Sequence, residues 1–371
     1  MRTLIGITMA GRCVMLCLIL AGLWGAPALG AQREDVEGEV IQLQGQAWVQ
    51  REVEGAEIPL AVRDLLHAGD TVRTAEVSEV QIRMADGSIL RVRPRSLMKM
   101  NDRRLTDGAG SSVALFLGRL WCQVTSLTKG RSFHVDTPTV VAGVRGTQYE
   151  VGAFDDGTAL VAVEEGTVQV EAAGKEMPVP AGQAMEVEYD APPQKPFSFD
   201  SSARAWEGWG ERRMKRIPVV LPPLTQKMHQ RISQGMEISR RLHKEILEQS
   251  NQVRQLMEEA AELKAQKKWQ RLKQVRDQIM AKRAKIMVLL QRLEKVDNRL
   301  AAAGPMVKKV HSLAEQFREP LGAQYRVVME RIRSLQQQAA MTRQVRQENR
   351  RAMEENRRRI LELREVLKEG R

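Results

Sequence analysis

Beyond Pro223 the apolar residues recur in alternating steps of three and four, and this spacing limits the possible folds more than any other feature. The clearest run has eight apolar residues in nine positions: Leu272, Val275, Ile279, Lys282, Ile286, Leu289, Leu293, Val296 and Leu300. This is the period of a coiled-coil seam. A single helix leaves so narrow an apolar stripe exposed to water, so the helix needs a partner. The sequence therefore predicts long helices that pack together.

Two further apolar frames flank this run. The earlier frame contains Met228, Ile232, Leu242, Ile246, Val253, Leu256, Ala260 and Leu263. It does not join the central run in register across Lys264–Gln270, so we expect a stutter or local unwinding there. The later frame contains Val328, Ile332, Leu335, Ala339, Thr342, Arg346, Asn349, Met353, Asn356, Ile360, Leu363 and Leu367. Its polar middle weakens the seam and is expected to set its register.

Glycine and proline predict where these helices end. Ala303-Gly304-Pro305 predicts the end of a first long helix at 224–303, because glycine followed by proline is a common helix stop. Pro320 predicts a kink or break in the C-terminal helices at 306–369. Folding back at Gly304–Pro305 gives an antiparallel hairpin, whereas pairing with a second copy gives a dimer or higher oligomer. We favour the hairpin, because it needs no second chain, and dimerisation can be added to it.

Residues 36–190 show the period of β-strands. In Val80–Met84 apolar and polar residues alternate, Asp86-Gly87 supplies a tight turn, and Leu90–Val92 resumes the alternation, which together predict a hairpin. Glu165-Gly166-Thr167-Val168 resembles Glu37-Gly38-Glu39-Val40, and Ala181-Gly182-Gln183 resembles Ala68-Gly69-Asp70, which suggests one β-unit used twice. The stretch is long enough to enclose its own core. We expect an all-β sandwich, roll or short solenoid.

The first 31 residues have the pattern of a cleaved signal peptide. Arg2 and Arg12 belong to a basic start, Cys13–Leu23 is almost continuously apolar, and Ala26–Gly30 offers small residues for cleavage. The apolar run is too short to cross a bilayer comfortably, so an uncleaved N-terminal anchor is the weaker alternative. The mature chain is therefore expected to be exported, to the periplasm or the cell surface.

The net charge of +12 is divided unequally along the chain. Residues 32–200 carry 17 basic and 26 acidic side chains, whereas residues 201–371 carry 39 basic and 20 acidic ones. Nucleic acid is the partner that the overall charge suggests, but the export signal argues against it. Anionic membrane headgroups, envelope polysaccharide or the chain's own acidic β-domain are better candidates, and a solvated helix face with local ion pairs is the simplest explanation.

Residues 191–223 are predicted to link the two halves. Proline-rich Asp190–Pro196 is expected to form a stiff extended spacer, and Pro222-Pro223 closes the linker. Trp206 and Trp209 lie between them. The simplest interpretation is that both rings pack back onto the β-domain, and the alternative is a surface that stacks on a cation or a glycan.

The β-region resembles the FecR family. The matching segments are Leu65–Thr74, Ala85–Ser88, Phe133–Val151, Glu164–Val168 and Ala181–Gln183. The resemblance implies an extracytoplasmic β-domain, as in a periplasmic regulator that relays iron-citrate signals from the outer membrane to a sigma factor. That regulator has a cytoplasmic helical segment before its membrane span. Only about twelve residues precede the apolar run here, so we do not expect signalling by that route.

The family signature supplies the candidate site residues. Arg145, between Gly143 and Gly146, could present its guanidinium to a carboxylate or phosphate of a ligand, or it could simply pair with an acidic neighbour. Thr137-Pro138 is expected to hold an extended entry into the next strand. With Gly143, Gly146 and Thr147, these two residues are expected to have mainly structural roles.

Several classes of function lack the residues they need. The sequence contains no Gly-rich phosphate loop, nucleophile elbow or His-Glu-x-x-His motif. His67 and His134 lack metal-ligand spacing, and Cys122 is expected to be a buried hydrophobe. We therefore expect no cofactor, no metal and no catalysis. A glycan hydrolase is the remaining enzymatic possibility, and it would need two carboxylates in one cleft from among Asp136, Glu150 and Glu164.

The sequence thus predicts a non-enzymatic exported envelope protein. Its FecR-like β-domain would bind a ligand or partner, either an envelope protein or a polysaccharide, and its basic coiled coil would position or assemble that domain. The alternative is a sensory or regulatory component of a cell-surface relay of the iron-transport type.

Overall fold

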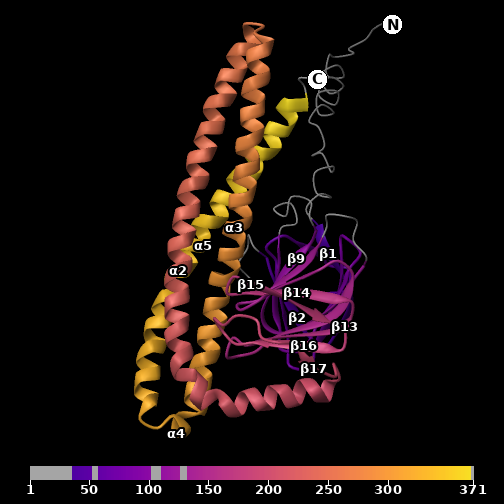
Figure 1. Ribbon diagram of the computed structural model, residues 1–371, viewed down its shortest axis with the longest axis vertical. Coiled ribbons are helices and arrows are strands. Elements are labelled where there is room, and N and C mark those ends of the chain that lie inside the picture. The colour runs from indigo at the N-terminus through magenta and orange to yellow at the C-terminus, as the bar shows by residue number, and fades with distance from the viewer. Residues whose placement is uncertain (1–35, 52–56, 102–109, 126–131, 369–371) are drawn as a thin grey trace, which may run out of the picture. The chain divides into compact units, whose positions relative to one another are not determined.

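A computed structural model describes residues 36–51, 57–101, 110–125 and 132–368, and the side chains of the last helix through Glu355 except that of Glu354. The chain divides into two units, residues 1–36 and 37–371. The predicted signal peptide lies outside the described residues. The prediction of an all-β domain followed by long helices is confirmed (Figure 1).

The strands of the described residues form two sheets that share one strand. The order in sheet A is β1 (Val36–Gln44), β6 (Glu79–Met84), β7 (Ile89–Val92), β9 (Ser112–Val124), β12 (Thr147–Ala153), β13 (Ala159–Glu165), β16 (Gln183–Val187) and β17 (Phe197–Ser198). The order in sheet B is β3 (Glu57–Pro59), β2 (Ala47–Gln50), β5 (Thr71–Thr74), β8 (Leu97–Met100), β9, β10 (Phe133–Asp136), β11 (Val141–Val144), β14 (Thr167–Ala172) and β15 (Lys175–Pro180). The short β4 (Leu65–His67) pairs with β1. Within these two orders β10 is parallel to β9, and the other neighbours are antiparallel.

Strand β9 passes from one sheet into the other at Gly118. Its first half pairs with β8 as far as Leu117, and its second half pairs with β12 from Gly118 onward. Gly118 has φ of +91°, and a Cβ there would lie 2.5 Å from the Cα of Ser96. Glycine is therefore required at this crossing, both for its backbone angle and for the close approach of the neighbouring strand.

Alternation along the strands builds one core from both sheets. In β6 the buried residues are Val80, Ile82 and Met84, and the hairpin to β7 turns at Gly87, whose φ is +88°. The predicted Asp86-Gly87 hairpin is thus confirmed. The inward side chains of both sheets form a single hydrophobic cluster that includes Val40, Val72, Leu115, Val151 and Val161. The FecR-like segments therefore fold as one domain.

The helices are α2 (Ala203–Ala265), α3 (Trp269–Gln316), α4 (Arg318–Leu321) and α5 (Gln324–Lys368). Helices α2, α3 and α5 pack against one another within the chain, and two hydrophobic clusters fill the space between them. Buried members of the predicted frames include Met228, Val275, Leu293, Val328 and Leu335. Much of the described part of the apolar stripes is therefore buried within one chain. Among the described helices, none is both long and apolar enough to cross a bilayer.

The turns between helices lie elsewhere than we expected. Gly304 and Pro305 do not end a helix, because α3 continues through both to Gln316. Proline removes the N–H that would bond the Ala301 carbonyl, but buried Met306 and Val310 hold the helix beyond it. The chain reverses instead at residues 266–268 and again around α4. Pro320 lies in the short helix α4, which separates α3 from α5, so the chain breaks before the last helix as predicted.

The register break that we predicted across Lys264–Gln270 is the first of these turns. The chain leaves the helical conformation there, and Lys267 has φ of +54°. The earlier apolar frame therefore lies on α2 and the central run lies on α3, and these two helices form the arms of a hairpin.

The expected linker is helical from Ala203. Ser202 begins α2, and its side chain accepts a hydrogen bond from the backbone N–H of Ala205. Pro218, Pro222 and Pro223 lie inside α2, which bends sharply between its first part and its long second part (Figure 1). Each proline removes one helical hydrogen bond, which bends a helix. Arg331 of α5 donates to the Pro222 carbonyl, 3.0 Å away, and supports the bent segment.

Candidate functional site

The FecR-like signature segment meets α3 beside a turn that Thr137 holds together. The Thr137 hydroxyl accepts hydrogen bonds from the backbone N–H groups of Thr139 (3.2 Å) and Val140 (2.8 Å) between β10 and β11. Thr139 in turn donates to the carbonyl of Gly157. Pro138 stands at the tip of this turn, where its fixed φ costs no ladder hydrogen bond. The geometry agrees with a structural role for Thr137-Pro138.

The remaining signature residues surround the bend between β11 and β12. A Cβ on Gly143 would lie 3.1 Å from the His134 ring, and Gly146 has φ of +139°. Thr147 is buried, whereas Arg145 is exposed on the bend. Arg145 is thus accessible, and its contact with a ligand stays a prediction.

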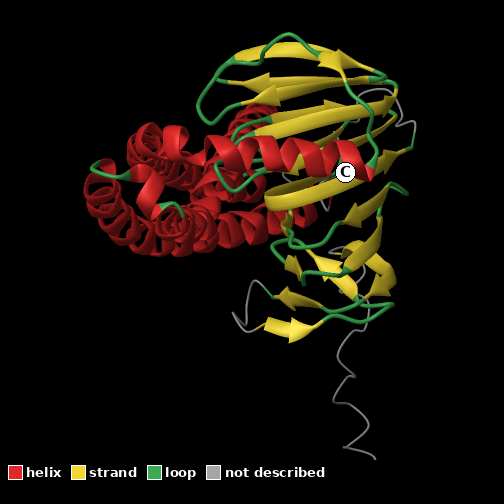
Figure 2. Ribbon diagram, turned by 90° about the horizontal axis from the view of Figure 1, so that it is seen from below, coloured by secondary structure: helices red, strands yellow, loops and turns green. Residues whose placement is uncertain are grey.

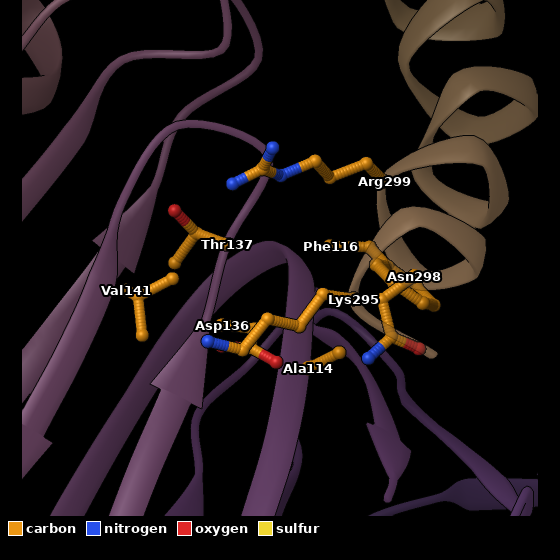
Figure 3. Close-up of a pocket in the computed structure, with 8 residues that line it drawn as sticks. All are labelled: Ala114, Phe116, Asp136, Thr137, Val141, Lys295, Asn298 and Arg299. Carbon is orange, nitrogen blue, oxygen red and sulfur yellow. The ribbon is translucent and has the colours of Figure 1, made fainter. Parts of the chain in front are cut away.

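Helix α3 places Lys295, Asn298 and Arg299 against Asp136 and Thr137 (Figure 3). The cavity between them is only about 10 Å³, which is the space of one water molecule at most. Burial raises the pKa of the Asp136 carboxyl, although Lys295 beside it acts in the opposite direction. Burial also disfavours the charged form of His134, and this lowers its pKa. This small cavity is a packed junction and has no room for a ligand.

A chain of buried polar groups continues from this junction into the helices. Asn101 donates to the Ser112 hydroxyl (3.1 Å) and to Asp136 (3.4 Å), and it accepts from Asn298 (3.0 Å). Lys99 donates to Asn298, 3.3 Å away. Such buried polar groups are tolerated because each has a partner. They fix where α3 lies on strands β8, β9 and β10.

Asp297, fully buried, extends the chain of polar groups to the other helices. Its carboxylate lies 3.9 Å from the Lys99 Nζ and accepts from Arg346 (3.3 Å) and Asn349 (3.4 Å) of α5. Ser239 of α2 donates to Asn349 over 2.9 Å. The polar middle that we predicted to set register in the last helix is therefore the point where α5 recognises α3.

Beside the small cavity lies a groove of about 270 Å³ between the signature turn and the helices. Its apolar wall includes Ile232, Val296 and Leu300. Its rim carries polar groups, among them Glu171 and the exposed Arg299, which also lines the small cavity. A groove of this size and mixed lining is just below the usual range for small-molecule sites. We name it the junction groove.

The two tryptophans of the expected linker lie on the outer face of sheet A. Trp206 is 2% exposed and Trp209 is 4% exposed, and they pack with Phe154 and Phe199 against Leu160, Ala162 and Ala184. Figure 2 shows this first part of α2 crossing the strands. The Trp209 Nε1 donates to Glu186 over 2.7 Å. With both rings covered, the geometry agrees with packing onto the β-domain, and a stacking role of either ring for a ligand stays a prediction.

Arg213 anchors the same part of α2 and is 2% exposed. Its guanidinium donates to Asp156 twice, to the Thr158 hydroxyl (2.7 Å), to Glu186 (3.1 Å) and to Glu188 (3.3 Å). Burial acts to lower the pKa of Arg213, but Asp156, Glu186 and Glu188 together outweigh it, and the pKa is raised. The sequence shows Arg213 only as one of two adjacent arginines, and no local signal marks it as buried.

The carboxylates considered for catalysis are held in separate interactions. Glu150 is buried and accepts from Arg93 (3.2 Å) and Arg119 (3.1 Å), and Glu164 accepts from the Trp121 Nε1 (3.1 Å). Each of these two carboxylates therefore has hydrogen-bond partners of its own within the β-domain. Within the described ranges, no group of three or more potential metal ligands occurs.

Cys122 is fully buried, and its pKa is raised by burial. It therefore lies in the core as a small hydrophobe, as predicted, and is far from the thiolate form that reacts.

Basic residues of the helices pair with acidic residues of the β-domain. Besides Arg213, Arg231 pairs with Asp190, Arg216 with Glu188 and Lys309 with Asp155. Part of the unequal charge along the chain is therefore compensated within the molecule.

One comparison with known proteins identifies the class of the β-domain. Residues 70–169 match the family model described as FecR protein, so the chain contains a FecR domain. No curated protein matches the sequence. Two crystal structures of a protein from Parabacteroides distasonis, provisionally described as an anti-sigma factor, are similar at 18% identity and a TM-score of 0.32. The match covers 38% of this chain and 63% of that protein.

A structure described as a cell surface anchoring domain is similar at 29% identity and a TM-score of 0.18, over 19% of this chain and 90% of that one. At these TM-scores the structural similarities assign neither an activity nor a partner to this chain.

Proposed function

We propose that this chain is a non-enzymatic protein of the cell envelope, in which the FecR domain and the helices together form a binding unit. The observation that carries the proposal is the junction groove, because its walls come from the signature turn and from α2 and α3. A ligand in that groove would contact both halves at once.

The way the halves are joined supports this role. The Arg213 cluster and the buried contacts of Asp297 hold the helices at defined positions on the sheets. A simple tether needs no buried ion pairs, and each buried charge costs several kcal/mol to desolvate. These buried ion pairs would be worth retaining if they keep the groove in one shape.

The mixed lining of the groove defines the class of ligand. Its apolar wall suits a short aliphatic or ring segment, and Arg299 on its rim suits a carboxylate or phosphate. Segments of an envelope protein and charged envelope polysaccharide both carry such groups. The structural roles of Glu150 and Glu164 support a function without catalysis.

The test is a paired substitution on α2. Gln234 is exposed and lines the groove, whereas Gln230, one helical turn away, is exposed and does not line it. We expect Gln234→Trp to abolish capture of envelope polysaccharide or protein by the purified mature chain, and Gln230→Trp to leave it intact. Equal capture by both variants would contradict the proposal. Similar far-UV circular dichroism of both variants controls for folding.

The predicted signal peptide supports an envelope location, and a reporter fusion tests it. Alkaline phosphatase is active only outside the cytoplasm, so a fusion after Ser198 should be active when residues 1–31 are present and inactive without them. N-terminal sequencing of the mature protein should find a cleavage site within Ala26–Ala31. An active protein that retains Met1 would indicate an anchor instead of a signal peptide.

The FecR match favours a second candidate, a regulatory component of a cell-surface signalling relay. Under that proposal the groove would bind a receptor segment or a sigma-regulating partner. Co-purification with such a partner that depends on Gln234, together with a transcriptional response lost on deletion, would favour the relay. Binding of polysaccharide alone would favour the first candidate.

A further inference from the structure

The turn between α2 and α3 is the most exposed charged segment in the described part of the helices. Every residue from Lys264 to Arg271 is exposed. Trp269 begins α3, and 61% of it is accessible to solvent, a large exposure for a residue that normally buries most of its ring. We call residues Lys264–Lys273 the hairpin tip.

The hairpin tip carries only one sign of charge. It contains five basic residues and no acidic one: Lys264, Lys267, Lys268, Arg271 and Lys273. Arg271 lies 3.6 Å from Glu259 on α2, and within the described residues none of the four lysines has an ion pair. These charges are therefore available to an external partner, unlike the helix cations that pair with the β-domain.

The stability of the two helices explains the positions of only some of these cations. Lys264 lies in the last turn of α2 and Lys267 follows its C-cap residue Gln266, and cations near this end interact favourably with the helix dipole. Arg271, however, lies in the first turn of α3, where a cation is unfavourable, and Lys273 follows directly. The first turn of α3 contains no acidic residue, and no side chain caps its N-terminus. A segment that breaks the local rules for a helix start is a candidate for function.

We propose that the hairpin tip docks the protein on an anionic lipid surface. The tryptophan ring would lie at the level of the headgroups, where its apolar face and its N–H are both accommodated. The five cations would contact the phosphates and anionic headgroups around it, as clustered lysines do on charged membranes. A lipid surface fits better than a folded partner, because an exposed tryptophan ring among exposed cations is the pattern of residues that anchor a protein at a membrane interface.

The experiment measures binding of the purified mature chain to vesicles by co-sedimentation. We expect binding to phosphatidylcholine vesicles that contain about one third phosphatidylglycerol, and little binding to pure phosphatidylcholine. High salt should release the protein, because it screens exposed charges. No binding to the anionic vesicles, or equal binding to both kinds, would overturn the proposal. Binding to envelope polysaccharide that is lost with tip variants, without binding to vesicles, would overturn it in favour of a glycan surface.

Paired variants assign the binding to the tip. The double variant Lys267→Gln/Lys268→Gln should weaken the partition by about 25-fold, because each cation near an anionic surface contributes about fivefold. The matched control is Arg240→Gln/Arg254→Gln, which removes two exposed cations from α2 outside the tip and should change the partition little. Equal losses in the two variants would show general charge attraction and contradict a tip site.

Arg271→Glu separates binding from folding. An acidic residue in the first turn of α3 is favourable for the helix, and the exposed ion pair with Glu259 that the substitution removes contributes little to stability, so the urea midpoint should change little. The charge reversal should nevertheless weaken vesicle binding by about 25-fold. In addition, the fluorescence of Trp269 should shift to shorter wavelength on anionic vesicles, and Trp269→Phe should remove that shift. A shift that survives in Trp269→Phe would contradict insertion of this ring.

Discussion

Replacing Arg213 by methionine should destabilise the molecule more than the same change at any other described arginine, because Arg213 is the most buried of them. Methionine keeps an unbranched apolar side chain in the site and removes the guanidinium. The side chain of Asp156 is fully buried, and without Arg213 it would keep the hydrogen bond from the N–H of Thr158, 2.9 Å away, but no ion pair within the described residues. Removing one member of a buried ion pair costs about 3–5 kcal/mol, because an uncompensated charge stays behind.

The neighbouring residue provides a matched control. Arg212 is exposed, so Arg212→Met should change the free energy of unfolding by no more than about 0.5 kcal/mol. A double variant that combines Arg213→Met with Asp156→Asn should recover part of the loss, because it removes the unpaired charge.

The assay is urea unfolding followed by two signals. Tryptophan fluorescence includes the signals of Trp206 and Trp209, which lie on the same part of α2 as Arg213, together with those of Trp48, Trp121 and Trp269. Far-UV circular dichroism reports the helices. We expect the fluorescence transition to shift to lower urea concentration in Arg213→Met. The reasoning is refuted if Arg213→Met and Arg212→Met unfold at the same urea concentration.

Three further predictions test other parts of the structure by the same unfolding assay. A Cβ at Gly152 would lie 2.7 Å from the Trp206 ring, so Gly152→Ala should lower the free energy of unfolding by about 1–3 kcal/mol. Its control is Gly208→Ala, in an open helical position, which should raise the free energy of unfolding by about 0.5–1 kcal/mol. Equal effects of the two substitutions would contradict the packing of Trp206. Pro305→Ala should stabilise α3 by up to about 3 kcal/mol, and a loss of stability would indicate that the helix ends there. Asp136 has a pKa raised by burial above its ordinary 3.8, so its ionisation disfavours the folded state and stability is lost as pH rises through the raised pKa. Asp136→Asn should therefore be more stable than the parent at pH 7 and differ little near about pH 4, and a constant difference would contradict the raised pKa.

Local periodicity made much of this fold predictable. The alternation in Val80–Met84 and its Asp86-Gly87 turn needed no distant contact to be recognised, and the same holds for the stripe from Leu272 to Leu300. The resemblance to FecR rested on motifs of adjacent residues and is confirmed by the family match.

Contacts between distant residues were not predictable in the same way. Arg213 and Asp156 are 57 positions apart, and Lys99 and Asn298 are 199 apart. No spacing rule connects such pairs in a single sequence, so both polar clusters were missed. Trp206 and Trp209 were easier, because large aromatic residues beside a sheet usually bury themselves.

The ends of the helices show how packing overrides local signals. Gly304-Pro305 is a strong stop signal, yet small buried Ala301, Ala302 and Ala303 before it and Met306 after it keep α3 intact. Lys264–Gln270 contains neither glycine nor proline, and the chain reverses there. The mismatch between apolar frames was the better indicator of that reversal, because it reflects which faces are buried.

Strand β9 links the unfolding of one sheet to that of the other. Its thirteen residues pair with β8 and β10 at one end and with β7 and β12 at the other. A slip of one residue along β9 would turn its inward side chains outward in both layers together. Neither layer can therefore melt or shift alone, and mechanical pulling on one edge should unravel the whole domain in a single step.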